Sequence, residues 1–460
     1  MNIVGENQEN TIINGQQSGY PIFQILGRFN VAISNLTLTN ASSAIFNYGT
    51  LYTNNITFTN NTGLIGGAVW NKQGGNLILI GSTFTNNNAN EGGAIGNNGQ
   101  MMVDNCTFLN NSAIYGGAIY SKGDTVTVDD SKFTNNSATD DFAYGGGAIY
   151  SYNDISLTID NSTFTNNTAT NGGAIGSTAH NFSVFNCTFT NNTATDGGAI
   201  WNVENDWSVV NSSFTNNIAG EDGGAIWGAN TQWSVRSSSF LNNSAGGYGG
   251  AIYDSNGIGN AMFNRFVGNS RTDIYSTYTD VTAEDNWWGT NFLGTDPLNS
   301  TRTNFNVTNW IVLSITANPT PIYKGNKSTV KADLLYDNTG NLLNGSIPDG
   351  IDVQFSSDTI GKVSPRGNTI TNGVVSTTFT GLTQGISVIS AIVDDQIVKT
   401  HITINKAPVS PNLNLKITAS QVKTNIGEKF TVTYDLNNNG ADNASNVSII
   451  LPLPTNFSVI

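Results

Sequence analysis

The stretch Asn161-Ser-Thr-Phe-Thr-Asn-Asn-Thr-Ala-Thr-Asn-Gly-Gly-Ala-Ile175 decides the fold of this 460-residue chain, because variants of it recur along more than half of the sequence. A phenylalanine marks each copy, at steps of roughly 25 residues, a period typical of repeat proteins. The nine phenylalanines are Phe58, Phe84, Phe108, Phe133, Phe164, Phe189, Phe214, Phe240 and Phe266. Each repeat of such a chain buries its apolar side only against its neighbours. The sequence therefore predicts a solenoid.

Two columns of apolar residues precede the phenylalanines and share one parity. Seven residues before them stand Leu77, Met101, Val126, Leu157, Phe182, Trp207 and Trp233, and five residues before stand Leu79, Val103, Val128, Ile159, Val184, Val209 and Val235. Residues two apart in a strand face the same way, so both columns point inward from one short strand. Trp207 and Trp233 are therefore expected in the core.

Asparagines and glycines mark the turns. An asparagine stands three residues after every phenylalanine: Asn61, Asn87, Asn111, Asn136, Asn167, Asn192, Asn217, Asn243 and Asn269. We interpret this column as a turn ladder, because asparagine tolerates left-handed backbone and can bond its own copy one coil away. Gly-Gly pairs such as Gly172-Gly173 supply a second turn where a side chain would clash. A further strand follows, with an Ala-Ile-aromatic pattern as in Ala118 to Tyr120.

These elements predict an all-β chain with a right-handed parallel β-helix over residues 1–312. Three short strands and two turns in about 25 residues leave no room for a helix, whereas a β-propeller needs about 40 residues and four strands per blade. The step after Phe133 is longer than its neighbours. We expect the phenylalanine column to continue there while residues 139–144 bulge outward.

The two cysteines are expected to be unpaired. Cys106 and Cys187 each stand two residues before a repeat phenylalanine, in a column otherwise held largely by serine. Coils about 4.8 Å apart place them roughly 14 Å from each other, and a disulfide needs Cα atoms within about 7 Å. We therefore expect small, inaccessible side chains without a redox or metal role.

The repeat pattern ends near Phe266, and residues 284–290 contain the adjacent Trp287 and Trp288. Terminal repeats of a solenoid are atypical because they cover its open end. We assign both tryptophans to a cap; a ligand site is the less favoured alternative.

Aperiodic strand patterns follow the cap. Residues 313–405 carry strand-like runs separated by turn signals, which suggests an Ig-like β-sandwich without the antibody-type disulfide: Val330–Leu335, Ile351–Phe355, Val374–Phe379, Ile386–Val393 and Val398–Ile404. Residues 406–412 form a Pro-containing linker. Residues 413–460 begin another sandwich, with strands at 429–436 and 447–453, and are too few to complete it.

Composition favours a secreted or surface-displayed protein. Charged residues are 11% of the chain, against a usual value of about 25%, and the formal net charge is −14. So few basic residues argue against nucleic acid or an anionic membrane as partner. No basic segment followed by an apolar stretch opens the chain, and no apolar run reaches about 18 residues. We expect a piece of a longer protein.

The quoted repeat resembles those of chlamydial polymorphic outer-membrane proteins. It is more similar still to those of large adhesin-like surface proteins of methanogenic archaea, in which a β-helix ending in an Asn-Trp-Trp-Gly-Thr motif, here residues 286–290, precedes Ig-like modules. Residues 313–405 resemble bacterial Ig-like domains of invasin type, and residues 412–460 resemble the start of a repeat domain common in such proteins. The resemblance implies an archaeal surface protein and supplies no catalytic motif.

The residues themselves do not assemble a catalytic centre. Asp104, Asp129 and Asp160 stand four residues before the phenylalanine in three consecutive coils and face outward by parity. Their carboxylates would repel one another at about 5 Å, which a bound cation could relieve; solvated strand-edge residues are the favoured interpretation. Asp196 and Asp222 are expected to form turns. No Ser-His-Asp set, zinc cluster or phosphate loop can be built, so we expect no enzyme, metal or cofactor.

A row of aromatic residues is the candidate binding surface. The residue after the strand isoleucine is Trp70, Gly96, Tyr120, Tyr150, Gly176, Trp201, Trp227 and Tyr253. Interior glycines would leave voids beside large rings, so the isoleucines should point inward and the rings outward. We propose Trp201, Trp227 and Tyr253 as a possible glycan-binding platform. Cross-coil stacking, or cover by another domain, is the structural alternative.

These observations favour a cell-surface adhesin or cell-envelope structural protein. Its β-helix would present a surface for glycans or partner cells, and its Ig-like domains would act as a stalk. A polysaccharide lyase or hydrolase, and a carbohydrate-binding module without catalysis, are the alternatives. Membrane insertion is not expected, and the sequence names neither the ligand nor the oligomeric state.

Overall fold

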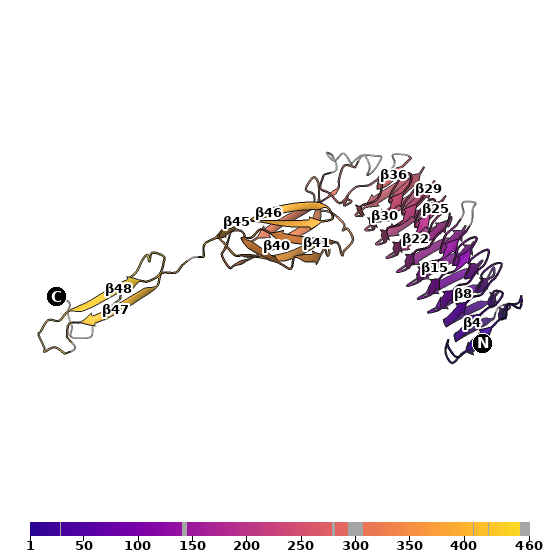
Figure 1. Cartoon of the computed structure of the whole chain (residues 1–460), viewed down its shortest axis with the longest axis horizontal. Coiled ribbons are helices and arrows are strands. Elements are labelled where there is room, and N and C mark those ends of the chain that lie inside the picture. Colours follow the sequence, from indigo (N-terminus) through magenta and orange to yellow (C-terminus); the bar gives the residue numbers. More distant parts are fainter. Residues whose placement is uncertain are drawn as a thin grey trace.

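The chain is all-β in a computed structural model, which describes residues 1–27, 29–139, 145–277, 281–292, 307–407, 409–421 and 423–450. Every regular element among these residues is a strand. Figure 1 shows a rod of stacked coils, a second β-domain and a hairpin in chain order. Within the described ranges, no helix has the length and apolar character that crossing a membrane requires.

Each repeat of the rod contributes strands to three faces. The columns seven and five residues before phenylalanine lie on β8 (Asn76–Ile80), β11 (Gln100–Asp104), β15 (Thr125–Asp129), β19 (Ser156–Asp160), β22 (Phe182–Phe185), β26 (Trp207–Val210), β30 (Gln232–Arg236) and β34 (Ile258–Met262), followed by β37 (Val281–Thr282). The phenylalanines lie on β9 (Thr83–Thr85), β12 (Thr107–Leu109), β16 (Lys132–Thr134), β20 (Thr163–Thr165), β23 (Thr188–Thr190), β27 (Ser213–Thr215), β31 (Ser239–Leu241) and β35 (Arg265–Val267).

Longer N-terminal strands join these two faces into one 21-stranded sheet. Its first members are β1 (Asn2–Val4), β2 (Ile12–Asn14), β4 (Asn30–Thr39) and β6 (Thr50–Thr59). Both β4 and β6 run along both faces, because β6 pairs with β8 through its first half and with β9 through its second half.

The third face is an 11-stranded sheet that carries the isoleucine and aromatic columns. Its strands are β3 (Phe23–Ile25), β5 (Ile45–Asn47), β7 (Val69–Asn71), β10 (Ile95–Asn97), β14 (Ile119–Lys122), β18 (Ile149–Tyr152), β21 (Ile175–Ser177), β25 (Ile200–Val203), β29 (Ile226–Ala229), β33 (Ile252–Ser255) and β36 (Ile274–Ser276). Two-residue strands also pair along the segment before the glycine pairs: β13 (Ser112–Ala113) with β17 (Ser137–Ala138), and β24 (Thr193–Ala194) with β28 (Ile218–Ala219) and β32 (Ser244–Ala245).

The predicted parallel β-helix is confirmed by the register. Phe108 pairs with Phe84 on one side and with Phe133 on the other, and every pairing between coils is parallel. From Phe58 to Phe266 the rings stack with centroids 4.6 to 5.0 Å apart. The column passes Phe133 unbroken, at 4.6 and 4.8 Å. Of the expected bulge at 139–144, residues 140–144 lie outside the described residues.

Both inward columns are buried as predicted, including Trp207 and Trp233 at 3% exposure each. The predicted glycine turn is also confirmed. Gly172 has φ +63°, and a Cβ added at Gly173 would collide with the carbonyl oxygen of Gly198 in the next coil. The backbone packs against itself there, so a larger residue would push two coils apart.

The asparagine ladder is confirmed, with one correction. The amide of Asn167 donates to Asn192 at 3.0 Å and to the carbonyl of Phe133 at 3.0 Å, and its oxygen accepts from Asn136. All of these side chains are buried. The left-handed residue, however, is the preceding one, as in Asn166 with φ +55°. In such a turn, one asparagine thus adopts the left-handed backbone conformation, and the next one forms the hydrogen-bond ladder.

Two further ladders were not predicted. Asn47 donates to Asn71 at 2.7 Å, and Asn71 donates to Asn97 at 2.6 Å, all fully buried inside the third face. In the serine column, a side chain accepts the backbone N–H of the preceding coil, as Ser131 does from Cys106 at 3.0 Å. Cys187 takes the same place, accepting from Ser162. Both cysteines are free and buried, as expected.

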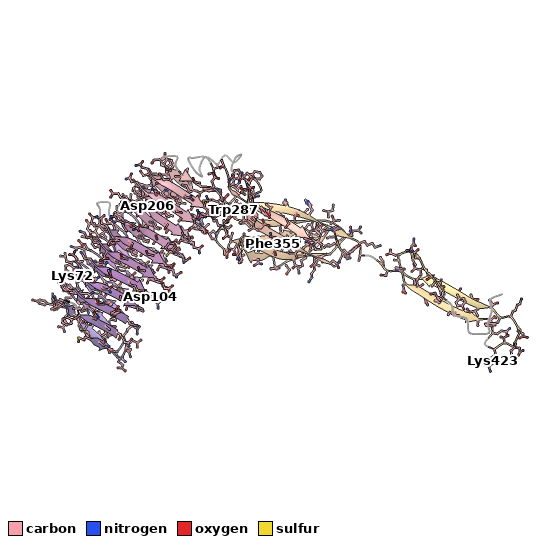
Figure 2. The ribbon with its side chains drawn as sticks, turned by 180° about the vertical axis from the view of Figure 1, so that it is seen from behind. Lys72, Asp104, Asp206, Trp287, Phe355 and Lys423 are labelled. Carbon is pink, nitrogen blue, oxygen red and sulfur yellow. The ribbon has the colours of Figure 1, made fainter. Side chains whose placement is uncertain are left out.

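The cap residues belong to two different cores. Trp288 continues the phenylalanine stack, with its centroid 4.8 Å from that of Phe266. Trp287 is instead buried in the core of the second domain, where its indole N–H donates to Asp394 at 2.6 Å. Arg265 also pairs with Asp394. Figure 2 shows Trp287 where the rod meets the second domain. The rod is therefore closed by the domain that follows it.

That domain consists of two sheets that share one core. One contains β38 (Ile311–Asn318), β40 (Lys327–Asp337), β44 (Val374–Gly381) and β42 (Gly361–Ser364), and the other contains β39 (Ile322–Tyr323), β46 (Gln396–Asn405), β45 (Gly385–Val393), β41 (Asp352–Ser357) and β43 (Gly367–Thr369). The two sheets support the predicted all-β domain after the rod, whose first strand, β38, begins two residues before the expected boundary at 313. The finer Ig-like assignment and the handedness of the rod stay predictions.

The last segment is a hairpin of β47 (Leu413–Ala419) and β48 (Val432–Asn438). The predicted strand at 429–436 is shifted, and the one at 447–453 is wrong for residues 447–450, which form no strand. Residues 451–453 lie outside the described residues. Nearly every side chain of the two hairpin strands is exposed, so these apolar residues pack against no second layer among the described residues.

Because the two asparagines of a turn have different roles, substituting them should change the stability of the rod by different amounts. Asn167→Ala should lower the free energy of unfolding by about 3 kcal/mol or more, because it leaves the buried carbonyl of Phe133 and the buried N–H of Asn136 in the preceding coil without this partner. Asn166→Gly should change it by less than about 0.5 kcal/mol, because glycine adopts positive φ freely. Denaturant unfolding of both variants measures this. Equal losses of stability in the two variants would contradict the different roles assigned to Asn166 and Asn167.

The cysteines should resist modification while the rod is folded. Burial raises the pKa of the Cys106 and Cys187 thiols to about 12, so almost no thiolate forms at pH 8. A thiol reagent at pH 8 should label neither residue in the native protein and both after denaturation, as counted by mass spectrometry. Rapid labelling of the native chain would contradict the buried column.

Candidate functional site

The aromatic row lies on the outer side of the third face. The isoleucines of this sheet are fully buried inside the rod, whereas Trp201, Trp227 and Tyr253 lie outside the solenoid core. Trp201 stacks on Trp227 with centroids 5.7 Å apart, and Trp227 stacks on Tyr253 at 6.1 Å. The predicted parity is therefore confirmed, and the three rings form one continuous stack.

The expectation of an exposed row requires correction. Trp201 is 6% exposed, while Trp227 and Tyr253 are half-buried. Parallel stacking hides the ring faces, and Gly145, which stands before a glycine pair, lies close to the row. A Cβ added at Gly176 would collide with the carbonyl of Gly145. The rings thus offer mainly their edges to solvent.

A groove of about 770 Å³ runs beside this row. Its ring-bearing walls are Tyr115, Tyr120, Tyr150, Tyr152, Trp201 and Trp227, and its remaining lining is Glu91, Asn153, Thr178, Val203, Glu204, Ala229, Asn230 and Ser255. The lining extends from the coil of β10, which contains Glu91, to that of β33, six coil steps that span on the order of 29 Å. Tyr253 stacks on the row without lining the groove.

The tyrosine half of the groove was not predicted as a site. Tyr120 and Tyr150 were visible in the aromatic column, but Tyr152 belongs to the column two residues further on, which also contains Lys122. Tyr115 comes from the segment before the glycine pair, and its ring centroid lies 6.4 Å from that of Tyr150. Only the coil-to-coil register brings these positions together.

The charged residues that line the groove, Glu91 and Glu204, are both acidic. Burial raises the pKa of Glu91, and the nearby charge of Lys122 opposes that shift. Burial also raises the pKa of Tyr120, and the charge of Glu91 adds to this. Lys122 lies against the Tyr152 ring, with its Nζ 5.3 Å from the centroid.

A buried carboxylate lies beneath the tyrosine half. Asp154 is fully buried and accepts hydrogen bonds from the hydroxyl of Ser151 at 2.6 Å, the hydroxyl of Ser121 at 3.1 Å and the backbone N–H of Asp124 at 3.2 Å. Burial outweighs these bonds and raises its pKa from 3.8 to about 6. The acid lies in the turn between β18 and β19, directly after Tyr152 and Asn153.

Asp154 should make stability depend on pH. Its folded pKa lies above its unfolded value, so its stabilising effect is complete below about pH 4 and is lost as pH rises through about 6. We expect the unfolding free energy of the wild type relative to Asp154→Asn to fall by roughly 3 kcal/mol between pH 4 and 7. Denaturant unfolding at several pH values measures this, with the exposed Asp352→Asn as control. A pH-independent difference would contradict it.

The proposed carboxylate column is partly assembled. Asp104 and Asp129 are register partners, and with Asp130 they place carboxylate oxygens within 4.8 Å of one another. Asp160 is not in that cluster and accepts a hydrogen bond from Asn186 at 2.8 Å. Neighbouring amides thus offset part of the repulsion. Solvated strand-edge residues stay the favoured interpretation, and a bound cation the less favoured alternative.

The turn roles of Asp196 and Asp222 agree with expectation. Asp196 accepts the backbone N–H of Asp222 at 3.0 Å, and Asp222 accepts that of Tyr248 at 2.7 Å. Both carboxylates therefore hold the turn before a glycine pair in the next coil.

Comparison with known proteins supports the repeat assignment. Six segments match the Chlamydia polymorphic membrane protein repeat: residues 105–122, 130–152, 161–178, 186–203, 211–229 and 237–255. The β-helix is thus similar in its repeats to that family. A search of curated proteins found no match. Among solved structures, the crystal structure of the S-layer protein SbsC domains 4 and 5 matches at 24% identity and a TM-score of 0.16, over 22% of this chain and 48% of that one.

Proposed function

We propose that this chain is a cell-surface or cell-envelope protein of the adhesin-like kind, whose β-helix binds a glycan chain along the aromatic groove without acting on it. The groove itself carries the proposal. It is elongated along the rod, and it combines tyrosine and tryptophan rings with amide and hydroxyl side chains. A small ligand would need a compact pocket; a groove spanning several coils suits a polymer.

The lining chemistry favours sugars over an apolar partner. Ring edges and the Trp227 indole contact C–H and hydroxyl groups, while Asn153, Asn230 and Ser255 offer donors and acceptors at the rim. Such sites pair apolar and aromatic surface with a few placed polar groups. The stacked strands hold both sets rigidly, so little ordering entropy is lost on binding.

Surface location is proposed from the repeats and composition. The matching repeat belongs to a membrane protein of Chlamydia by its description. The chain has few charged residues and is rich in asparagine, threonine, serine and glycine. An extracellular setting, with the Ig-like sandwich as a stalk for the rod, accommodates both observations. Glycans or a partner cell surface are the proposed partners.

The spacing of the groove carboxylates favours binding over hydrolysis. Glu91 precedes β10 and Glu204 follows β25, so four coil steps separate them, roughly 19 Å. A glycosidase pair lies about 5 to 9.5 Å apart across the scissile bond. The two groups therefore cannot act together on one glycosidic bond.

Substitutions of half-buried groove rings test the proposal. Trp227→Ala and Tyr152→Ala should each weaken binding to glycans selected on an array by roughly tenfold, because each removes ring contacts of about 1.4 kcal/mol. Calorimetric titration measures the affinity. Trp201→Ala is unsuitable, because truncating a nearly buried tryptophan costs about 3 to 5 kcal/mol of stability.

Tyr52→Ala is the matched control, since this tyrosine is 44% exposed on another face of the rod. It should leave affinity unchanged. If all three variants bind like the wild type, the glycan site is not this groove. If the wild type binds no glycan, the proposed function fails.

A further inference from the structure

The charged residues that line the groove are all acidic. Glu91 and Glu204 line it, and none of its described lining residues is a lysine, arginine or histidine. Asp154 lies beneath the tyrosine half, and Asp196, Asp222 and Asp254 surround Tyr253 at the far end of the ring row. A concave surface lined by one sign of charge focuses its field on whatever enters.

The nearest described cation does not reverse this sign. Lys122 lies over the ring of Tyr152, and its charge acts on Glu91. That contact holds the ammonium group at the tyrosine end of the groove. The tryptophan end, where Glu204 lies beside Trp201 and Trp227, has no described basic group in its lining.

Glu204 occupies a strained backbone position. Its φ is +74°, and the residues that turn the chain at the same place in other coils are Asn153 at +54° and Asn230 at +55°. Asparagine tolerates this conformation, whereas a long acidic residue adopts it only at a cost in stability. The turn is held by the backbone N–H of Glu204, which donates to Ala229 at 3.0 Å. Asparagine would satisfy the fold here, so the carboxylate is explained by another role.

We propose that the groove admits glycans without carboxylate or sulfate groups and excludes acidic ones, and that Glu204 is the main determinant of this selection, assisted by Glu91. The inference rests on the proposed glycan-binding function and narrows its ligand class. An acidic chain would place like charges beside the exposed carboxylate of Glu204. A neutral chain meets no such repulsion, and an amino-sugar chain is attracted.

The test compares hexasaccharides of equal length composed of neutral, amino and uronic acid sugars, all titrated into the full chain at low and high salt. We expect the uronic acid probe to bind at least tenfold more weakly than the neutral one at low salt. High salt should reduce this difference in affinity, because dissolved ions screen the repulsion between charges that lie more than about a Debye length apart. Glu204→Lys should reduce the affinity difference between the neutral and the uronic acid probe by roughly fivefold. Glu9→Lys, at an exposed position, should leave this difference unchanged.

Glu204→Asn separates the effect on glycan selectivity from the effect on folding, because it introduces the residue that other coils have at this position. We expect a higher melting temperature together with weaker discrimination against the uronic acid probe. Equal or tighter binding of the acidic probe to the wild type would overturn the inference alone. Discrimination unchanged in both Glu204 variants would also overturn it. Absence of binding by all three probes would overturn the proposed function as well.

Discussion

The hydrogen bond between an asparagine side chain and its own copy one coil away is the interaction on which the rest of the rod depends. Asn136, Asn167 and Asn192 bond in sequence at 3.0 Å. Each side chain also bonds the backbone of the preceding coil, as Asn167 does with the carbonyl of Phe133 and the N–H of Asn136. Because the same amide must recur at the same height in every coil, insertions are confined to the segments between turns. The phenylalanine stack and the flat register of the third face follow from this constraint.

Much of the rod could be predicted because its pattern is local. Parity placed Trp207 inside and Trp227 outside, and the spacing of Cys106 and Cys187 excluded a disulfide. Parity does not reveal what another part of the coil covers, which is why the burial of Trp201 was missed. It also cannot show that Trp287 enters the second core, because adjacent residues of a strand face opposite sides. The groove walls likewise come from positions that only the coil register brings together.

The groove illustrates how a repetitive scaffold acquires an individual site. Most coils repeat the same residues at the turns, so departures from the repeat carry information. Tyr152 and Glu204 are such departures, and both line the groove. The buried Asp154 supports the same region through three hydrogen bonds. Local exceptions on a regular frame give a defined surface without changing the fold.

The adjacent tryptophans at the end of the rod have a mechanical consequence. Trp288 is fixed in one core and Trp287 in the other, and the peptide bond between them therefore cannot serve as a hinge. The Asp394 contacts with Trp287 and Arg265 resist torsion at the same point. A force applied through the sandwich would thus rotate the whole rod with it. The direction in which the groove faces would therefore be set by the orientation of the sandwich.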